Sequence, residues 1–273
     1  MTKKEAQFVA AVWAHYEKNG RHDLPWRKAI APYKILVSEL MLQQTQVDRV
    51  LPKFKLFIKT WPTVAKLAVA PQAEVLRAWQ GLGYNRRAKF LHLAAKAVME
   101  QGGAFPKDEL SLRRLPGVGP YTASAIMAFA YDIPTTMIET NIRQAYLHHF
   151  YKDSVGVSDA ELLFLIEQTC PTERVREWYW ALMDYGSHLK RLHGNINTKS
   201  KHYTKQSTFR GSDREIRGVI LRKLAEVSRV SRLPKQQLMR QLSELDKTKI
   251  VRQLKKLAAE DLISVDQDGY FLK

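Results

Sequence analysis

Apolar residues recur at helical spacing along most of the chain, and polar or glycine-containing segments separate these stripes. In the first stripe, Phe8, Val12 and Tyr16 follow one another at the spacing that places them on one face of a helix. Comparable stripes follow in residues 33–47, 63–67, 75–79, 88–99, 161–166 and 178–183. An alternating pattern of strand length does not occur before residue 260. The sequence therefore predicts a mainly α fold.

The character of the sequence changes in its last third. Residues 193–212 are polar, basic and interrupted by glycine, which is typical of a linker or of a surface loop. Ser212 and Glu215 then form a capping-box pattern that predicts a helix through Val227. Two more helices and a strand pair around Asp268-Gly269 are predicted at 235–245, 247–259 and 262–272. Three helices and a terminal β-hairpin predict a winged helix-turn-helix.

The third helix of this predicted domain carries the basic residues Lys249 and Arg252. Many winged helices place their third helix in the major groove of DNA, whereas others pack against a neighbouring domain or dimerise. The basic residues favour DNA contact.

A glycine hairpin lies between two helical patterns in the middle of the chain. Its sequence is Leu115-Pro116-Gly117-Val118-Gly119. Proline ends the preceding helix, and the two glycines allow positive φ and close approach of another backbone. The next helix opens with Tyr121 and Thr122, so its first N–H groups lie at a positive dipole end and can bind a phosphate.

A lone carboxylate, Glu139, follows this hairpin about twenty residues later and is itself followed by Asn141. A phosphate-binding hairpin followed by a carboxylate indicates chemistry on a nucleic acid. The alternative interpretation is an ordinary corner between two helices, because glycine and proline are common in turns.

The charge of the chain favours the first interpretation. Its 273 residues carry a formal net charge of +17, which indicates a polyanionic partner such as nucleic acid. An anionic membrane surface is the competing partner, but no apolar run is long enough to span a bilayer and the N-terminus lacks a signal-peptide core. We therefore expect a soluble intracellular protein of the cytoplasm or nucleoid.

Cysteine usage excludes several kinds of site. The single cysteine, Cys170, cannot form an internal disulfide, a zinc site of several thiolates or an iron–sulfur cluster with four cysteine ligands. The eight histidines are scattered, and we predict no metal site among the side chains.

Several motifs together resemble the helix-hairpin-helix DNA glycosylases, most closely the MutY-like adenine DNA glycosylases. They fall in order between Leu24 and Leu192 and comprise Pro25-Trp26-Arg27, residues 38–47, residues 79–84, residues 115–123 and residues 138–141.

The resemblance implies two catalytic carboxylates. Glu39 matches the acid that protonates adenine at N7, and Glu139 matches the catalytic aspartate that stabilises the oxocarbenium ion or attacks C1′. Asn141 matches the neighbour that orients this second carboxylate. Glutamate in place of aspartate moves the carboxylate by roughly a bond length, and small misplacements can cost ~10²-fold in rate.

Other matching positions imply how DNA is handled. Tyr121 lies where the lyase relatives carry a Schiff-base lysine, so the resemblance implies base removal without strand cleavage. Gln43, Gln44 and Tyr84 match residues that fill or flank the gap left by a flipped base. The basic residues expected to contact DNA are Arg86 and Arg87, after the 81–84 corner, and Lys190 and Arg191, in the segment 190–205.

The chain also departs from the resembled family. Lys190 stands where the first of four cluster-ligating cysteines would be, so we expect no iron–sulfur cluster and no other cofactor, although the hairpin is compatible with the monovalent cation seen in this family. We expect the winged helix to stand in the place of the family's domain that recognises 8-oxoguanine.

Four parts are predicted. Residues 26–130 form a six-helix barrel that contains the hairpin, and residues 1–25 with 131–205 form a second helical domain without a cluster. Residues 206–211 are a linker, and residues 212–273 are the winged helix. The leading hypothesis is a monofunctional glycosylase that removes adenine mispaired with 8-oxoguanine or guanine in double-stranded DNA, acting as a monomer. The alternatives are a mismatch thymine or uracil glycosylase and a DNA-binding module with weak or no catalysis.

Overall fold

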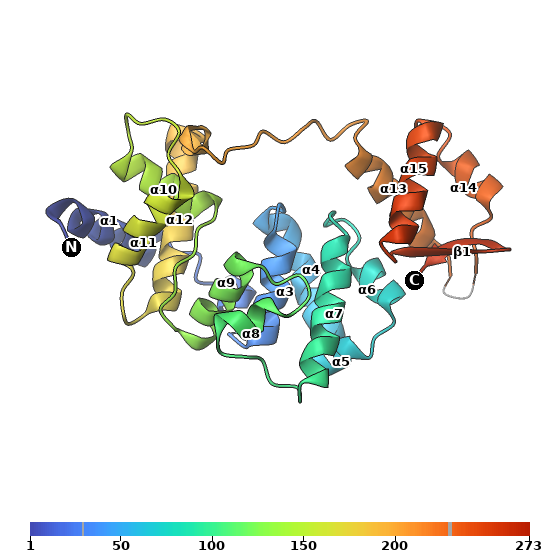
Figure 1. The fold of residues 1–273 in the computed structure, drawn as a ribbon, viewed down its shortest axis with the longest axis horizontal. Helices are drawn as coiled ribbons and strands as arrows, with labels where there is room; N and C mark the ends of the chain where they lie inside the picture. Colours follow the sequence, from blue (N-terminus) through green and yellow to red (C-terminus); the bar gives the residue numbers. More distant parts are fainter. Residues whose placement is uncertain (29, 229–230) are drawn as a thin grey trace. The chain divides into compact units, whose positions relative to one another are not determined.

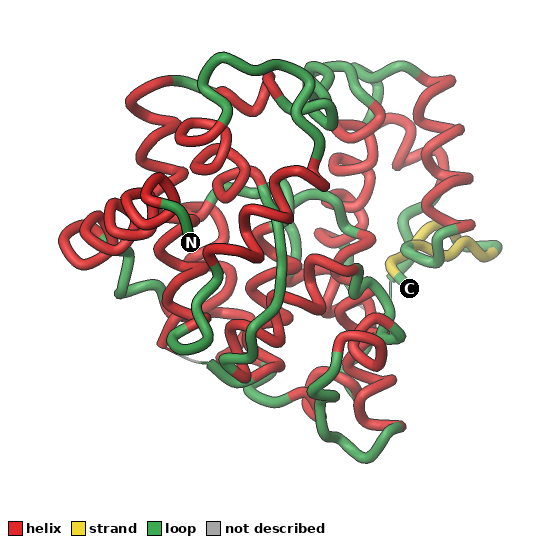
Figure 2. Tube along the Cα trace, turned by 60° about the vertical axis from the view of Figure 1, so that its left-hand side comes forward, coloured by secondary structure: helices red, strands yellow, loops and turns green. Residues whose placement is uncertain are grey.

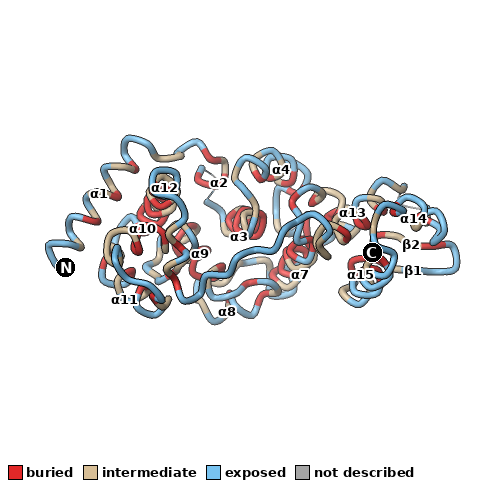
Figure 3. Tube along the Cα trace, turned by 90° about the horizontal axis from the view of Figure 1, so that it is seen from above, coloured by how far each residue is buried: buried red, intermediate tan, exposed pale blue. Residues whose placement is uncertain are grey.

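The computed structural model describes residues 1–28, 30–228 and 231–273, and they are mainly helical (Figure 1). The chain divides into two compact units. The first contains residues 1–36, 105–114 and 118–205, and the second contains residues 37–104, 115–117 and 206–273. Helix α3 (Pro32–Leu42) crosses the boundary between them, and the residues along it are almost all buried (Figure 3).

The first unit is helical throughout. Its elements are α1 (Lys3–Asn19), α2 (Pro25–Lys28), α8 (Glu109–Arg113), α9 (Pro120–Tyr131), α10 (Thr140–Phe150), α11 (Asp159–Thr169), α12 (Val175–His193) and the 3₁₀ helix η1 (Ile196–Lys199). Helices α1 and α10 both pack against α12. The rings of Phe8, Tyr146 and Trp178 meet in this core, so the first predicted stripe of apolar residues is confirmed as a buried face.

An ion pair is buried in the same unit. The Asp184 carboxylate of α12 accepts hydrogen bonds from both terminal nitrogens of Arg27, at 2.7 and 2.9 Å, and the two side chains are 2% and 4% exposed. Arg21 adds a third charged contact at 2.6 Å. Burial raises the pKa of Asp184, but the two arginines more than offset this effect, and the pKa lies below its ordinary value.

The second unit combines helices from the middle of the chain with the C-terminal domain. Its elements are α4 (Val47–Thr60), α5 (Val64–Ala68), α6 (Gln72–Ala78), α7 (Arg86–Glu100), α13 (Asp213–Glu226), α14 (Lys235–Gln241), α15 (Lys247–Ala259), β1 (Ile263–Asp266) and β2 (Gly269–Leu272). The two strands are antiparallel, with Ile263 opposite Leu272, and are the only strands among the described residues (Figure 2). The predicted winged helix-turn-helix is confirmed.

The turn of the wing differs by one residue from the prediction. Residues 267–268 form the turn and Gly269 already opens β2. The side chain of Asp266 accepts hydrogen bonds from the N–H groups of Asp268 and Gly269, at 3.1 and 3.2 Å. A Cβ on Gly269 would lie 2.3 Å from the carbonyl oxygen of Leu233, so this position requires glycine because of a close backbone approach.

The winged helix contacts helices from the middle of the chain, and the domain boundary at residue 212 stays a prediction. Arg77 of α6 donates hydrogen bonds to the carbonyls of Ala225 and Val227, at 3.4 and 3.2 Å. Lys89 of α7 donates to the carbonyl of Glu260 at 2.7 Å. These contacts, with the packing of α13 on α6, place residues 206–273 in one unit with residues 37–104.

We expect Asp184→Asn to lower the free energy of unfolding by about 3–5 kcal/mol, because it leaves the buried Arg27 charge without its counter-ion. Urea denaturation followed by circular dichroism measures this change. The control is Asp23→Asn, which breaks an ion pair with Lys28 whose side chains are 97% and 64% exposed, and which we expect to leave stability unchanged. Equal effects of the two substitutions would contradict this account of the buried pair.

Candidate active site

The carboxylate of Glu139 is fixed at the start of α10. Glu139 is the N-cap residue, and its Oε1 accepts hydrogen bonds from the N–H groups of Asn141 and Ile142, both at 2.9 Å. Its Oε2 accepts from the Thr140 hydroxyl and from the Asn141 side-chain amide, both at 3.1 Å. Four donors therefore hold this carboxylate in one orientation at the positive end of the helix dipole.

Two opposing effects act on the charge of Glu139. Burial raises the pKa of its carboxyl group, and the N–H donors of Asn141 and Ile142 lower it; the effect of burial is larger, so the pKa lies above its ordinary value. Asn141 makes the contact that its predicted orienting role requires.

Gly186 of α12 sets the position of this helix start. A Cβ at Gly186 would lie 1.9 Å from the carbonyl oxygen of Asn141, so α10 and α12 approach each other more closely than any side chain allows. This role of Gly186 was not among the sequence predictions. The available signal was a glycine inside a helical pattern, which costs helix stability and therefore indicates a packing or functional reason.

Glu39 occupies a different setting. It lies on α3 within the second unit, and only 7% of it is exposed. The residues from Ile35 to Met41 are all buried, so Glu39 is a carboxyl group within an otherwise mainly apolar helix segment. Glutamate is rarely buried in this way unless it is paired or functional.

The hairpin has the predicted positive φ at one of its two glycines, since Gly119 has a negative φ of −86°. Gly117 has a φ of 77°, and a Cβ there would lie 2.5 Å from Cβ of Phe90. Gly119 is the N-cap of α9, and Pro120 begins that helix. The side chains of Leu115, Val118 and Thr122 are buried, so only their backbone groups could contact a phosphate, and the half-buried Tyr121 follows Pro120 at the helix start.

Arg87 differs from its predicted role as a DNA contact. Its residue is 7% exposed, and its guanidinium donates to the carbonyl oxygens of residues 40, 41, 43, 82, 83 and 84 and to the Thr45 hydroxyl. Burial lowers its pKa to about 10, so it keeps its charge at neutral pH. With its donors facing the protein, Arg87 is a structural residue, whereas the neighbouring Arg86 is exposed.

The hydrogen bonds of Arg87 fix the backbone around Gln43, Gln44 and Tyr84. We call these three residues the Gln44–Tyr84 corner. Gln44 and Tyr84 have positive φ angles of 55° and 46°, a conformation that costs free energy for residues with a side chain. The Tyr84 ring lies 5.5 Å from the Arg87 guanidinium, and Tyr84 is still 41% exposed. Strained but exposed residues of this kind cluster at functional sites.

The remaining predicted DNA contacts have two different settings. Lys190 and Arg191 are exposed in the last turn of α12. Lys249 instead donates to the carbonyl of Gly211 at 3.0 Å, and Arg252 pairs with Asp213 at 2.6 Å, so both have partners within the protein. Their DNA contact stays a prediction.

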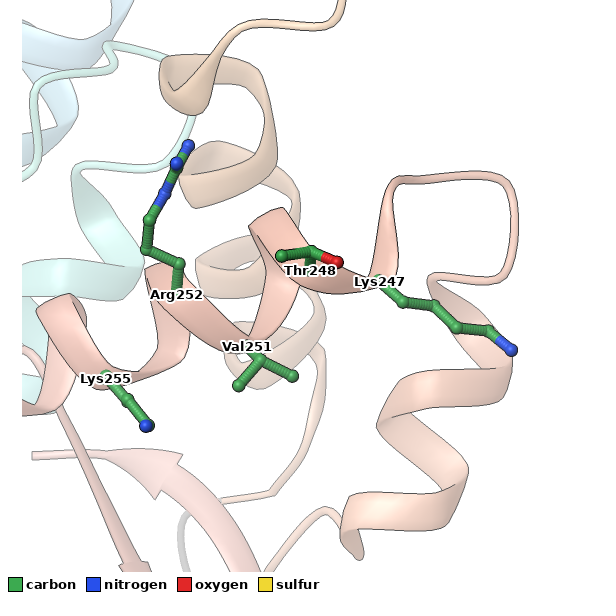
Figure 4. A pocket seen from close by; sticks show the side chains of 5 residues that line it. All are labelled: Lys247, Thr248, Val251, Arg252 and Lys255. Atoms are coloured by element: carbon green, nitrogen blue, oxygen red, sulfur yellow. The ribbon is translucent and has the colours of Figure 1, made fainter.

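The exposed face of α15 carries further cations in addition to Lys249 and Arg252. Figure 4 shows Lys247 and Lys255 extending from this helix, and they line a shallow hollow with Thr248, Val251 and Arg252.

Within the described ranges, His, Cys, Asp and Glu form no group of three that could hold a metal ion. The monovalent cation at the hairpin stays a prediction. No helix in the same ranges is long and apolar enough to cross a membrane.

Comparison with known proteins identifies the family. Residues 37–208 match the model of the HhH-GPD superfamily of base excision DNA repair proteins. The chain belongs to the HhH-GPD superfamily. This membership confirms the resemblance drawn from the motifs, and the matched residues include Glu39, the hairpin and Glu139.

Individual HhH-GPD proteins are also similar to this chain. The adenine DNA glycosylase of Mycolicibacterium smegmatis is 39% identical over 62% of this chain and 59% of its own length. The adenine DNA glycosylase of Mycobacterium tuberculosis H37Rv is 41% identical over 64% of this chain and 59% of its own length. A solved thermostable thymine-DNA glycosylase is 27% identical, with a TM-score of 0.61 over 68% of this chain and 87% of its own. The chain thus spans about three fifths of these two curated relatives.

We expect Gly186→Ala to lower the free energy of unfolding by about 1–3 kcal/mol, because a methyl group forces α10 and α12 apart. The matched control is Gly218→Ala on α13, where a Cβ meets nothing within 4 Å; this change is expected to raise stability by about 0.4–1 kcal/mol. Thermal denaturation compares the two variants. A neutral or stabilising Gly186→Ala would show that the close approach is not needed.

Proposed function

We propose that this protein is a monofunctional DNA glycosylase that removes a mispaired adenine from double-stranded DNA. The observation that carries the proposal is the carboxylate of Glu139, which four donors fix at the start of α10. A fixed negative charge of this kind can stabilise the positive charge that develops on a sugar as its glycosidic bond breaks. The adenine specificity is supported by the relatives at 39% and 41% identity.

The proposed reaction uses the two carboxyl groups in different roles. Glu39 donates a proton to N7 of adenine, and the bond between C1′ and N9 breaks with its electron pair going to the base. Glu139 stabilises the resulting oxocarbenium ion and accepts a proton from the water that adds to C1′. The products are free adenine and an abasic site in an intact strand. Tyr121 supports the last point, because a phenol cannot form the imine through which a lyase cleaves DNA.

Charge supports the proposed partner. The net charge of +17 and the exposed cations on α12 and α15 favour double-stranded DNA. We propose that the protein acts as a monomer inside the cell, in the cytoplasm or nucleoid. We also propose that it works without an iron–sulfur cluster, because Cys170 is the single cysteine of the chain.

A second candidate is the removal of thymine or uracil opposite guanine. The specific observation in its favour is the similarity to the solved thymine-DNA glycosylase. Pyrimidine removal needs less acid catalysis than adenine removal, so the two candidates differ in how strongly they depend on Glu39.

Single-turnover excision, measured as alkali-labile abasic sites, tests the proposal. The duplexes pair adenine with guanine, cytosine or 8-oxoguanine, and thymine or uracil with guanine. We expect Glu39→Gln to slow adenine release by ~10²–10⁴-fold and Glu139→Gln to slow it by ~10²–10³-fold. The matched control is Glu100→Gln at the exposed end of α7, which should leave the rate unchanged.

The outcomes of this panel are distinct. Release of thymine or uracil alone would establish the second candidate. Binding of every duplex without release of any base would establish a DNA-binding module instead. Full adenine release by Glu39→Gln would refute the acid assignment.

The pKa of Glu139 predicts how excision depends on pH. Catalysis needs its carboxylate form, and burial places its pKa above the ordinary value, so the rate should fall on the acid side with a midpoint above that of an ordinary glutamate. Thr140→Ala removes a hydroxyl donor that favours the charged form, so the midpoint should move to higher pH. Single-turnover rates between about pH 4 and 8, with folding checked by circular dichroism, measure both. An unchanged midpoint in Thr140→Ala would contradict the assignment.

A further inference from the structure

The chain segment that precedes the winged helix returns to the Gln44–Tyr84 corner. The side-chain nitrogen of Gln206 donates to the Gln44 amide oxygen at 2.9 Å and to the Tyr84 hydroxyl at 2.6 Å. A terminal nitrogen of Arg214, on α13, donates to the same hydroxyl at 3.0 Å. All four residues lie within the second unit. Residues distant in sequence therefore converge on one phenol oxygen.

These contacts hold Tyr84 at its far end. A phenol oxygen accepts two hydrogen bonds and donates one, so Gln206 and Arg214 fill its acceptor positions, while the Arg87 guanidinium faces the ring 5.5 Å away. The backbone of Tyr84 has a positive φ and is bonded by Arg87 through its carbonyl oxygen. The side chain is thus held at the backbone, the ring and the hydroxyl.

Arg214 is itself held in place by neighbouring groups. Its second terminal nitrogen donates to the carbonyl of Ser207 at 2.7 Å. Lys249 and Arg252 of α15 bind the adjoining residues Gly211 and Asp213. A continuous set of contacts therefore runs from the third helix of the winged domain to the hydroxyl of Tyr84.

We propose that Gln206 and Arg214 are positioning residues, which hold Tyr84 and Gln44 in the geometry that distinguishes the base opposite the excised one. This inference rests on the proposed function, since it concerns how that reaction selects its substrate. The winged helix is then a working part of base selection, in addition to any contact that its outer face makes with DNA.

The exposure of these groups argues for positioning over a general role in stability. Gln206 is exposed and Arg214 half-buried, and hydrogen bonds at such positions add little to folding because water competes for the same groups. A misplacement of about 1 Å at a site that contacts a substrate can nevertheless change a rate by ~10²-fold. The two residues can therefore affect selection strongly without affecting folding.

The experiment is a double-mutant cycle between Arg214→Met and Tyr84→Phe, read as single-turnover excision of adenine opposite guanine and opposite cytosine. Alone, Arg214→Met should reduce the ratio of the excision rates on the two duplexes by about 10-fold, a value typical of a lost charged hydrogen bond. This ratio is the preference that the experiment measures. On the Tyr84→Phe background, which lacks the accepting hydroxyl, the same change should have little further effect. Arg214→Lys, which retains a donor, should restore part of the preference.

The matched control is Arg222→Met, an exposed arginine on the same helix, which should leave the preference unchanged. Urea denaturation verifies that each variant is folded. Additive effects of Arg214→Met and Tyr84→Phe, or an unchanged preference in Arg214→Met, would overturn the proposal.

If the unaltered protein excises no base, the proposed function fails, and the cycle is then read as the preference in duplex binding. Non-additivity in binding would support the positioning role without catalysis, and additivity would overturn it.

Discussion

A single buried arginine organises the part of the protein that carries Glu39 and the Gln44–Tyr84 corner. The Arg87 guanidinium bonds the carbonyls at the end of α3 and those of the turn after α6. The last carbonyls of a helix lack partners within it and carry partial negative charge, so the Arg87 cation can satisfy the end of α3 and the following turn without a carboxylate. Glu39 lies one residue before the first of these carbonyls, and Tyr84 contributes the last of them.

Much of the fold could be predicted because it depends on local patterns. The stripe in residues 247–259 and Gly117 of the hairpin each specify their conformation over a few residues, and the structure confirms them. At Ser212 the structure confirms the N-cap, whose side chain accepts from the N–H of Glu215, but not the capping box, because the Glu215 carboxylate accepts from the N–H of Gly211 and not from that of Ser212. The role of Arg87 could not be predicted in this way, because a basic residue beside a corner has the same sequence signature whether it faces solvent or six carbonyls. Gly186 depends on a contact between two helices, which no local pattern contains.

The glutamate at position 139 is compatible with a catalytic role because of how a helix begins. N-cap side chains accept hydrogen bonds from the second and third N–H groups of the helix, and Glu139 does so through one oxygen. Its additional methylene is accommodated by folding the carboxylate back over α10, where the Thr140 hydroxyl and the Asn141 amide bind the other oxygen. The position of the carboxylate therefore depends on the start of α10, which Gly186 fixes against α12.

The same use of cations at helix ends changes how the net charge of +17 is interpreted. Arg77 donates hydrogen bonds to the carbonyls at the end of α13, and Lys89 donates to the carbonyl of Glu260, which follows α15. Arg176 donates to the carbonyls of residues 129 and 130 at the end of α9. Together with Arg87, these cations serve helix ends within the protein, so they are poorly placed to neutralise phosphates. The number of cations that can contact DNA phosphates is therefore smaller than the composition indicates. The cations available for this contact are those with exposed side chains, such as Arg86, Lys190 and Lys247.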